Sequence, residues 1–175
     1  MELLKLESLT PYLEDLVAVL LDAVDMGASI GFLPPMSETE AKMYWLKVED
    51  ELTDNSRQVL VVRENGRIVA TVQIAMSPKA NALHRCEVEK LMVLSSARHQ
   101  GYARALMQGV ERVAASMQRQ LITLDTRTED DAYYLYQKIG YTAFGCVPNY
   151  ARSASGSLDS STFFYKEIDT THEVF

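Results

Sequence analysis

Residues 91–104, LMVLSSARHQGYAR, run from an apolar strand pattern through a loop of small residues into the start of a helix. The unpaired N–H groups of a helix's first turn, together with the positive end of its dipole, favour a bound anion. Gly101 and Ala103 allow the backbone to approach such an anion closely. Positive side chains surround the turn in an otherwise acidic chain, namely Arg98, His99 and Arg104. The segment therefore predicts a pyrophosphate site, with an ordinary strand-to-helix connection as the alternative interpretation.

The chain before this segment predicts an antiparallel meander. Val59 to Arg63 and Ile68 to Met76 are rich in β-branched residues, and Asn65-Gly66 between them is the strongest short signal for a tight hairpin. A weak alternation marks a first strand at Glu2 to Glu7, and another strand is expected at Cys86 to Leu94.

Two helices are expected between the first and second strands. Thr10-Pro11 begins a helix that should end near Gly27, and Ser37 to Glu40 is a capping box that opens the second helix. The loop from Gly27 to Pro35 holds three sizeable apolar residues, Ile30, Phe32 and Leu33. These residues either plug the core or form a lid over a substrate, and the sequence leaves both interpretations open.

Helix and strand patterns alternate in the second half of the chain. A helix is expected from about Gly101 to Gln118, then a strand at Leu121 to Asp125 and a helix at Asp130 to Ile139. Strands near Tyr141 to Val147 and Thr162 to Lys166 complete the pattern. The order predicts a mixed α/β fold, with a central, mostly antiparallel sheet, one parallel strand–helix–strand crossover, and helices on both faces.

Length and composition limit the possible functions. With 175 residues the chain suits one domain, expected over residues 1–168, followed by a flexible tail at 169–175. The net charge of −7 argues against nucleic-acid binding, and no apolar run is long enough for a membrane span. The first residues do not resemble an export signal, so a cytoplasmic location is expected. Cys86 and Cys146 lack metal-site spacing, so we expect no metal and place both cysteines in the core.

Two motifs resemble signatures of the GNAT N-acetyltransferases. Arg98 to Ala103, RHQGYA, is similar to the family's acetyl-CoA motif, Q/R-x-x-G-x-G/A. Ala132 to Tyr141, AYYLYQKIGY, resembles the second motif, A-x-x-L-Y-x-K-x-G-F/Y. The resemblance extends over roughly Leu60 to Lys166 and implies the GNAT fold and N-acetyl transfer from acetyl-CoA. The chain departs from the pattern at Ala103, where Gly is commoner, and at Glu129, where Asn is frequent.

This resemblance implies that acetyl-CoA is the co-substrate and lies along the crossover. Backbone groups of Leu91, Met92 and Val93 are expected to pair with the pantetheine arm like an added strand. The Val93 N–H is also expected to polarise the thioester carbonyl. N–H groups of the following turn hold the pyrophosphate in the family, and here that turn consists of Arg98, His99, Gln100, Gly101, Tyr102, Ala103 and Arg104.

Three shorter stretches resemble one branch of the family more closely. GASIGF at residues 27–32, EVEKLMVL at 87–94 and LDT at 124–126 are similar to the tabtoxin-resistance acetyltransferases, which modify a small amino-acid-like toxin. This likeness implies an amino-acid-like or antibiotic-like amine as the acceptor. The candidate substrate contacts are Ile30, Phe32, Glu89 and Asp125.

The expected chemistry needs an acid and a base. An alkyl amine is mostly protonated at neutral pH, so its attack on a thioester requires a group that takes the proton. Glu87 stands four residues before Leu91, where GNAT enzymes often carry a general base, and alternation puts Glu89 on the same face. Asp125 either attracts the ammonium, shares the base role, or caps the following turn. Tyr136 matches the family's usual general acid, which protonates the departing thiolate.

Three functions remain open at this stage. The leading one is direct acetyl transfer to a small-molecule amine in a ternary complex. A protein or peptide N-acetyltransferase would instead need an open groove beside the loop from Gly27 to Pro35, and a non-catalytic acetyl-CoA sensor would keep the cleft without the chemistry. A homodimer is expected, because the C-terminal strands of such enzymes often pair between subunits.

Overall fold

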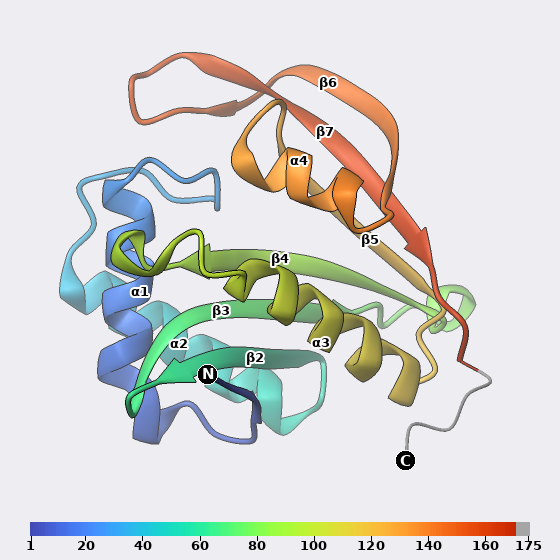
Figure 1. Cartoon of the computed structure of the whole chain (residues 1–175), viewed down its shortest axis with the longest axis horizontal. Coiled ribbons are helices and arrows are strands. Elements are labelled where there is room, and N and C mark those ends of the chain that lie inside the picture. Colours follow the sequence, from blue (N-terminus) through green and yellow to red (C-terminus); the bar gives the residue numbers. More distant parts are fainter. Residues whose placement is uncertain (171–175) are drawn as a thin grey trace.

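The computed structural model describes residues 1–170, whose strands form one seven-stranded sheet in the order β1-β2-β3-β4-β5-β7-β6 (Figure 1). The strands are β1 (Glu2–Leu6), β2 (Arg57–Glu64), β3 (Arg67–Met76), β4 (Arg85–Val93), β5 (Leu121–Arg127), β6 (Thr142–Arg152) and β7 (Leu158–Glu167). Neighbouring strands are antiparallel except β4 and β5, which are parallel. The predicted mixed sheet is therefore confirmed. Of the expected flexible tail, residues 171–175 lie outside the described residues.

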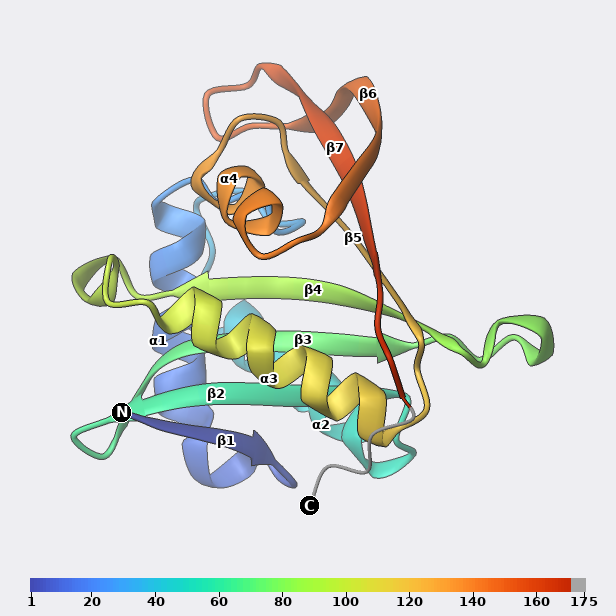
Figure 2. The ribbon, with the colours of Figure 1, turned by 45° about the vertical axis from the view of Figure 1, so that its right-hand side comes forward.

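Helices cover both faces of this sheet (Figures 1 and 2). They are α1 (Leu13–Asp25), α2 (Glu38–Thr53), α3 (Tyr102–Ser116) and α4 (Asp131–Lys138). On one face α1 and α2 enclose Trp45, which is fully buried and donates from its indole N–H to the Leu16 carbonyl at 2.9 Å. On the other face α3 and α4 enclose a second core around Leu106 and Phe164. The strands between these two cores are therefore held from both sides.

The predicted turn signals form as expected. Asn65 and Gly66 have φ angles of 50° and 81°, the left-handed pair that a type I′ hairpin between β2 and β3 requires. At the start of α2 the Ser37 hydroxyl accepts from the Glu40 N–H at 3.2 Å. The Glu40 carboxylate accepts from the Ser37 N–H at 2.8 Å, which completes the capping box.

The C-terminal hairpin departs from the sequence prediction in two ways. β6 continues through Pro148 to Arg152, because β6 is the outer strand of the sheet and a missing N–H there need not break a ladder. The register with β7 shifts between Val147 and Ala151, which accommodates the proline. The prediction that both cysteines are core residues was wrong for Cys146, which is exposed because the outer strand has little cover.

The parallel pair β4–β5 is short and opens the fold. Within the described chain, these strands pair only at Arg85–Leu121, Cys86–Ile122 and Glu87–Thr123. Beyond Glu87 the strands diverge, so that β5, β7 and α4 lean away from β4 (Figure 2). β4 also bulges where its register with β3 shifts between Thr71 and Gln73, and Lys90 there has a φ of 54°. One edge of β4 is thus left without a neighbouring strand.

Candidate active site

A cleft of about 1140 Å³ occupies the space between the diverging strands. Single small-ligand sites usually hold roughly 300–1,000 Å³, so this cleft has room for two substrates. The sequence-predicted residues that line it are Ile30, Glu87, Glu89, Leu91, Met92, Val93, Arg98, His99, Gly101, Tyr102, Ala103, Arg104, Asp125 and Tyr136. Gln100 is exposed outside this lining, and Phe32 lines a smaller cavity beside it.

The β4 side of the cleft offers main-chain groups. Leu91, Met92 and Val93 lie beyond the parallel pairing, so the backbone groups that point away from β3 have no strand beside them among the described residues. An extended ligand can pair with such an edge as an added strand. The Met92 side chain is buried, so this residue presents its main chain to the cleft. The open edge therefore fits an arm that carries its own amide groups.

The turn before α3 combines two left-handed residues with a helix N-terminus. His99 and Gly101 have φ angles of 63° and 82°, and Gly101 is the N-cap residue of α3. Alternating backbone handedness turns N–H groups toward one concavity, and the first-turn N–H groups of a helix add to it. A Cβ at Gly101 would meet nothing within 4 Å, so the backbone conformation, and not lack of space, favours glycine there. The turn fits an anion held by main-chain donors.

Three carboxylates gather on the side of the cleft that faces α1 and α2. Cys86 and Val88 point into the α3 core, so alternation turns Glu87 and Glu89 to the opposite face of β4. Asp125 takes the equivalent face of β5, because Leu124, the residue before it, points into the same core. The sequence prediction that Glu87 and Glu89 share one face therefore agrees with the structure, and Asp125 lies on the same side.

The surroundings raise the pKa of two of these carboxylates. The Glu87 side chain is exposed, yet the surrounding protein desolvates its carboxylate enough to raise its pKa, and the charges of Glu89 and Asp125 raise it further. Burial also raises the pKa of Asp125, although a hydrogen bond from Ser161 and the charge of Lys90 oppose that rise. A raised pKa makes a carboxylate a better proton acceptor.

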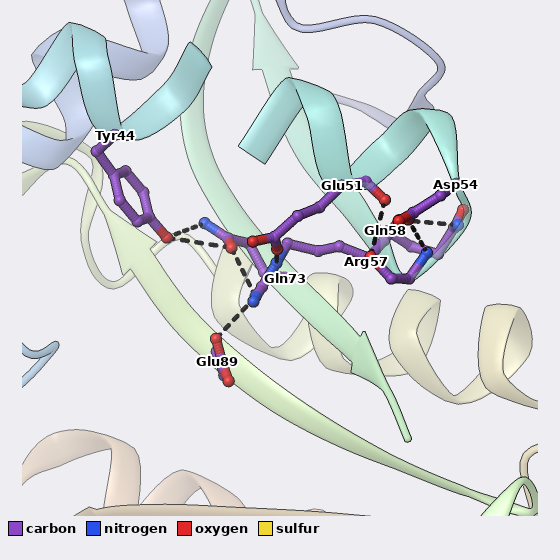
Figure 3. A network of polar contacts seen from close by, with 8 residues as sticks. Tyr44, Glu51, Asp54, Arg57, Gln58, Gln73 and Glu89 are labelled. Carbon is purple, nitrogen blue, oxygen red and sulfur yellow. Dashed lines mark hydrogen bonds and ion pairs between the residues drawn. The ribbon is translucent and has the colours of Figure 1, made fainter. Parts of the chain in front are cut away.

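Glu89 is held by a polar network that crosses the sheet from α2 (Figure 3). Its carboxylate accepts from Arg57 Nη1 at 2.7 Å, and the same nitrogen donates to Gln73 Oε1 at 3.0 Å. Arg57 is also paired with Glu51 of α2. The buried Gln73 exchanges hydrogen bonds with the Tyr44 hydroxyl, whose pKa burial raises to about 12. The ion pair commits Glu89 to Arg57, which makes it a poorer candidate for the base.

Tyr136 projects from α4 into the cleft and is only 4% exposed. Its ring packs against Tyr141 and Phe164, with ring centroids 5.8 Å apart in both pairs. Burial raises the pKa of its phenol, and the charges of Asp130 and Asp125 add to the rise. The phenol therefore stays protonated at neutral pH, as a proton donor to a thiolate must.

The α1–α2 loop both fills the core and walls the cleft. Ile30 lines the cleft and packs against the α1–α2 core. Phe32 meets Tyr44 edge-on, with ring centroids 5.1 Å apart, and Lys90 Nζ lies 5.7 Å from the centre of the Phe32 ring. Leu33 is 47% exposed and so does not plug the core. For Ile30 and Phe32, filling the core and covering a substrate are compatible roles, because one side of each residue packs in the core.

Three residues around the site were not singled out in the sequence analysis. Lys90 carries the bulge, but lysine is not a residue that favours positive φ, so the sequence gives no sign of it. Arg57 acts through Glu89, 32 residues away in the chain. Arg127 did have a signal, because it follows Asp125 by two residues and strand alternation puts both on one face.

Two further kinds of feature are absent from the part of the chain that the structure describes. Residues 1–170 hold no group of three or more His, Cys, Asp or Glu side chains placed to bind a metal ion. No helix in the same range is both long and apolar enough to cross a membrane.

Residues 29–141, well over half of the chain, match the family model described as the acetyltransferase (GNAT) family. This chain belongs to the GNAT family. The matched region contains both motifs that suggested the family and every predicted cofactor contact of the GNAT protein. The identification from the sequence, as an acetyltransferase of this family, is confirmed. The closer likeness to the tabtoxin-resistance enzymes stays a prediction.

Solved structures share the fold of this GNAT chain at low sequence identity. An N-acetyltransferase from Staphylococcus aureus superposes with a TM-score of 0.80 at 18% identity, covering 95% of this chain and 99% of that one. The ribosomal-protein-alanine N-acetyltransferase of Brucella melitensis gives 0.79 at 20% identity, with 94% and 99% covered. The protein yncA of Salmonella typhimurium, solved with its cofactor acetyl-CoA, gives 0.79 at 15% identity, with 99% and 98% covered.

Proposed function

We propose that this GNAT protein transfers the acetyl group of acetyl-CoA directly to the amine of a small, amino-acid-like or antibiotic-like molecule. The observation that carries the proposal is the convergence, in one cleft, of the open β4 edge, Glu87, Asp125 and the Tyr136 phenol. Amine and thioester fit together in such a cleft, so one ternary complex suffices and positioning supplies much of the acceleration.

Acetyl-CoA is proposed to lie along β4 and to end at the α3 turn. Leu91 to Val93 would pair with the pantetheine arm, and the Val93 N–H would polarise the thioester carbonyl. Main-chain donors from Arg98 to Arg104 would hold the pyrophosphate, with Gln100 contributing its backbone only. The Salmonella typhimurium neighbour, which holds acetyl-CoA on the same fold, supports this placement.

Glu87 is proposed as the general base and Tyr136 as the general acid. Glu87 takes a proton from the acceptor ammonium, directly or through one water, and the freed amine attacks the thioester carbon. As the C–N bond forms, the C–S bond breaks and the thiolate takes the Tyr136 proton. The amide nitrogen then loses its second proton, and solvent exchange restores both side chains, so one proton is released in each turnover.

Asp125 and Glu89 are proposed to bind the acceptor ammonium without taking its proton. Asp125 lies on the same face as Glu87, and the ion pair with Arg57 fixes the position of the Glu89 carboxylate. Such fixed charges orient the amine toward the thioester. Ile30 and Phe32 would supply the apolar wall.

The experiment that tests this function is a CoA-release assay with acetyl-CoA against amines, amino acids, aminoglycosides and N-terminal peptides. Turnover of a small amine supports the proposal. A peptide with a higher kcat/KM than every free amine would replace it with protein N-acetylation. Binding of acetyl-CoA with no turnover of any acceptor would favour the sensor.

Protein N-acetylation is the alternative that one observation favours. The Brucella melitensis neighbour is a ribosomal-protein-alanine N-acetyltransferase, although a likeness at 20% identity shows a shared fold only. Beside this cleft the turn between β6 and β7 comes close to the α1–α2 loop, because a Cβ added at Gly27 would lie 3.6 Å from the Ala154 Cβ. That closure supports the small acceptor over a polypeptide.

We further propose that residues 1–168 act as one domain and that two copies associate through β6. The continuous sheet supports a single domain, and the outer position of β6 supports association through that strand. Phe144 and Tyr150 on β6 are 61% and 50% exposed, although single exposed aromatics are common on surfaces. A monomer mass in light scattering at micromolar concentration would contradict the dimer. The cytoplasmic location stays a prediction for cell fractionation.

A further inference from the structure

A smaller cavity of about 210 Å³ adjoins the acceptor end of the cleft. Its walls are the α1–α2 loop from Gly27 to Pro34, the end of β5, and the end of β6 with the turn that follows it. Gly27, Ser29 and Arg127 line both spaces, so an acceptor in the cleft can extend into this cavity. Of the residues that line it, the roles proposed above account only for Phe32.

The described residues that line this cavity include two arginines and no carboxylate. Arg127 donates from Nη2 to the Gly27 carbonyl at 3.1 Å. Its Nε lies 2.9 Å from Asp159 Oδ2 but is not aligned for a hydrogen bond. Arg152 donates from Nη1 to the Gly156 carbonyl at 2.7 Å. Each guanidinium has five N–H donors, more than these contacts use. Asp159 is paired with Arg127, and the charge of Arg127 also acts on Asp130.

Lys90 adds a further positive charge beside the cavity. Its Nζ lies 5.7 Å from the centre of the Phe32 ring and 3.7 Å from the place of a Cβ at Gly31, and both residues line the cavity. Burial lowers the pKa of Lys90, while the charges of Glu89 and Asp125 act in the opposite direction. The cavity is therefore a positive region next to the acidic centre of the cleft.

The acidic and basic groups follow one another along β5. Arg127 comes two residues after Asp125 on the same face of the strand, which separates their Cα atoms by about 7 Å. An ammonium group at Asp125 and an anionic group near Arg127 can therefore belong to one small molecule. This order of charges matches a zwitterion, with its amine toward the thioester and its acid toward the cavity.

We infer that Arg127 and Arg152 form a subsite for the carboxylate of the acceptor, which makes amino acids and related amino carboxylates the substrate class. The role rests on the proposed function, because it assumes that the acceptor amine lies at Glu87 and Asp125. Planar guanidinium groups suit carboxylates, which they bind through paired hydrogen bonds. The contacts of Arg127 hold it in place before the acceptor arrives, and Arg152 closes the cavity from β6.

Binding of reaction products tests this subsite without turnover. The protein saturated with CoA is titrated in a calorimeter with N-acetyl amino acids and with the matching N-acetyl amino-acid amides, which lack only the carboxylate. We expect at least one acid to bind about tenfold more tightly than its amide, as a charge-assisted hydrogen bond would provide. Equal affinities throughout the panel, or no binding of any acid at millimolar concentration, would overturn the subsite.

Arg152→Gln is the decisive variant, because Arg152 is exposed and its replacement leaves both cores intact. We expect the preference for acid over amide to fall about tenfold, toward equal binding. Arg112→Gln removes an exposed arginine of α3 away from the cavity and should keep the full preference. Arg127→Gln should also lose the preference, with its melting temperature recorded because Arg127 braces the α1–α2 loop. A preference that survives in both cavity variants would overturn the subsite.

Failure of the subsite and failure of the proposed function give different results. Equal turnover of amino acids and their amides would leave N-acetyl transfer standing and remove the subsite. Acid-selective binding that depends on Arg152, without turnover of any acceptor, would establish the subsite and overturn the proposed function.

Discussion

The two sides of the cleft are built from different parts of the polypeptide. The proposed cofactor side is mainly backbone, the open edge of β4 and the left-handed turn before α3. The proposed acceptor side presents charged side chains, such as Glu87 from β4 and Asp125 from β5. A backbone site tolerates changes of side chain that preserve its φ angles, whereas a single substitution changes the chemistry of a side-chain site. The comparison predicts where substitutions will matter most.

The largest effect is expected on the acceptor side, at Glu87. Glu87→Gln should lower kcat about a hundredfold or more, because it removes the proposed base, and CoA release measures this. In wild type the activity should rise with pH through a pKa above the ordinary glutamate value, since only the ionised carboxylate accepts a proton. The variant should lose this rise of activity with pH. A variant kcat within threefold of the wild-type kcat would contradict the expectation that substitutions on the acceptor side have the largest effects.

Thermal unfolding provides the control for Glu87→Gln. A carboxyl whose folded pKa is raised stabilises the fold below its unfolded pKa and loses this contribution as the pH rises through the folded value. At neutral pH the ionised Glu87 therefore costs stability, and the glutamine variant should melt no lower than wild type. A loss of activity in a variant that melts no lower than wild type would then reflect the missing base and not unfolding.

A smaller loss of rate is expected at Tyr136. Tyr136→Phe keeps the ring packing against Tyr141 and Phe164 but removes the proton donor, so kcat should fall roughly ten- to hundredfold. The KM for acetyl-CoA should change little, and steady-state kinetics separates the two. Tyr134→Phe, at a 48% exposed tyrosine of the same helix, is the matched control. Equal losses in the two variants would contradict the assignment of the acid.

Arg57 should affect both stability and the pH profile. Arg57→Met leaves Glu51, Glu89 and the buried Gln73 without their shared partner, and we expect a loss of about 2 kcal/mol in the free energy of unfolding. The Arg57 charge also lowers the pKa of Glu87, so the activity of the variant should rise at higher pH than in wild type.

The control for Arg57 is an arginine whose ion-pair partner is exposed. Arg63→Met removes the pair with Glu2, whose side chain is 54% exposed, and should lower the free energy of unfolding much less than Arg57→Met does. Denaturant titration compares the two variants. Equal losses would show that the network beneath Glu89 is no stronger than a surface ion pair.

The smallest effects are expected from side-chain changes on the cofactor side. His99 has a φ of 63°, which asparagine tolerates and β-branched valine does not. His99→Asn should raise the KM for acetyl-CoA by at most about threefold, and His99→Val by about tenfold, because roughly 1–2 kcal/mol of backbone strain falls on the turn. Steady-state kinetics at saturating acceptor would measure both. The reverse order would mean that the imidazole, not the main chain, binds the cofactor.

Local sequence patterns predicted most of the secondary structure. The Asn65-Gly66 turn, the capping box at Ser37 and the helical spacing of α3 each depend on neighbours a few residues away, and all formed where expected. The strand expected near Tyr141 to Val147 continues through Pro148, because the effect of a proline depends on whether its strand lies inside the sheet or at its edge. Cys146 was misplaced for the same reason, since burial depends on what packs over a strand.

By itself, the sequence determined the fold class and the family and predicted the segment proposed to face the cofactor, because these follow from local spacing and from glycine at a left-handed turn. Tertiary structure alone brought together the residues of the proposed acceptor side. The bulge at Lys90, the pairing of Arg57 with Glu89 and the cavity shared by Arg127 and Arg152 depend on residues far apart in the chain. Such arrangements depend on strand divergence and register, which the residue pattern within a short stretch of sequence does not specify.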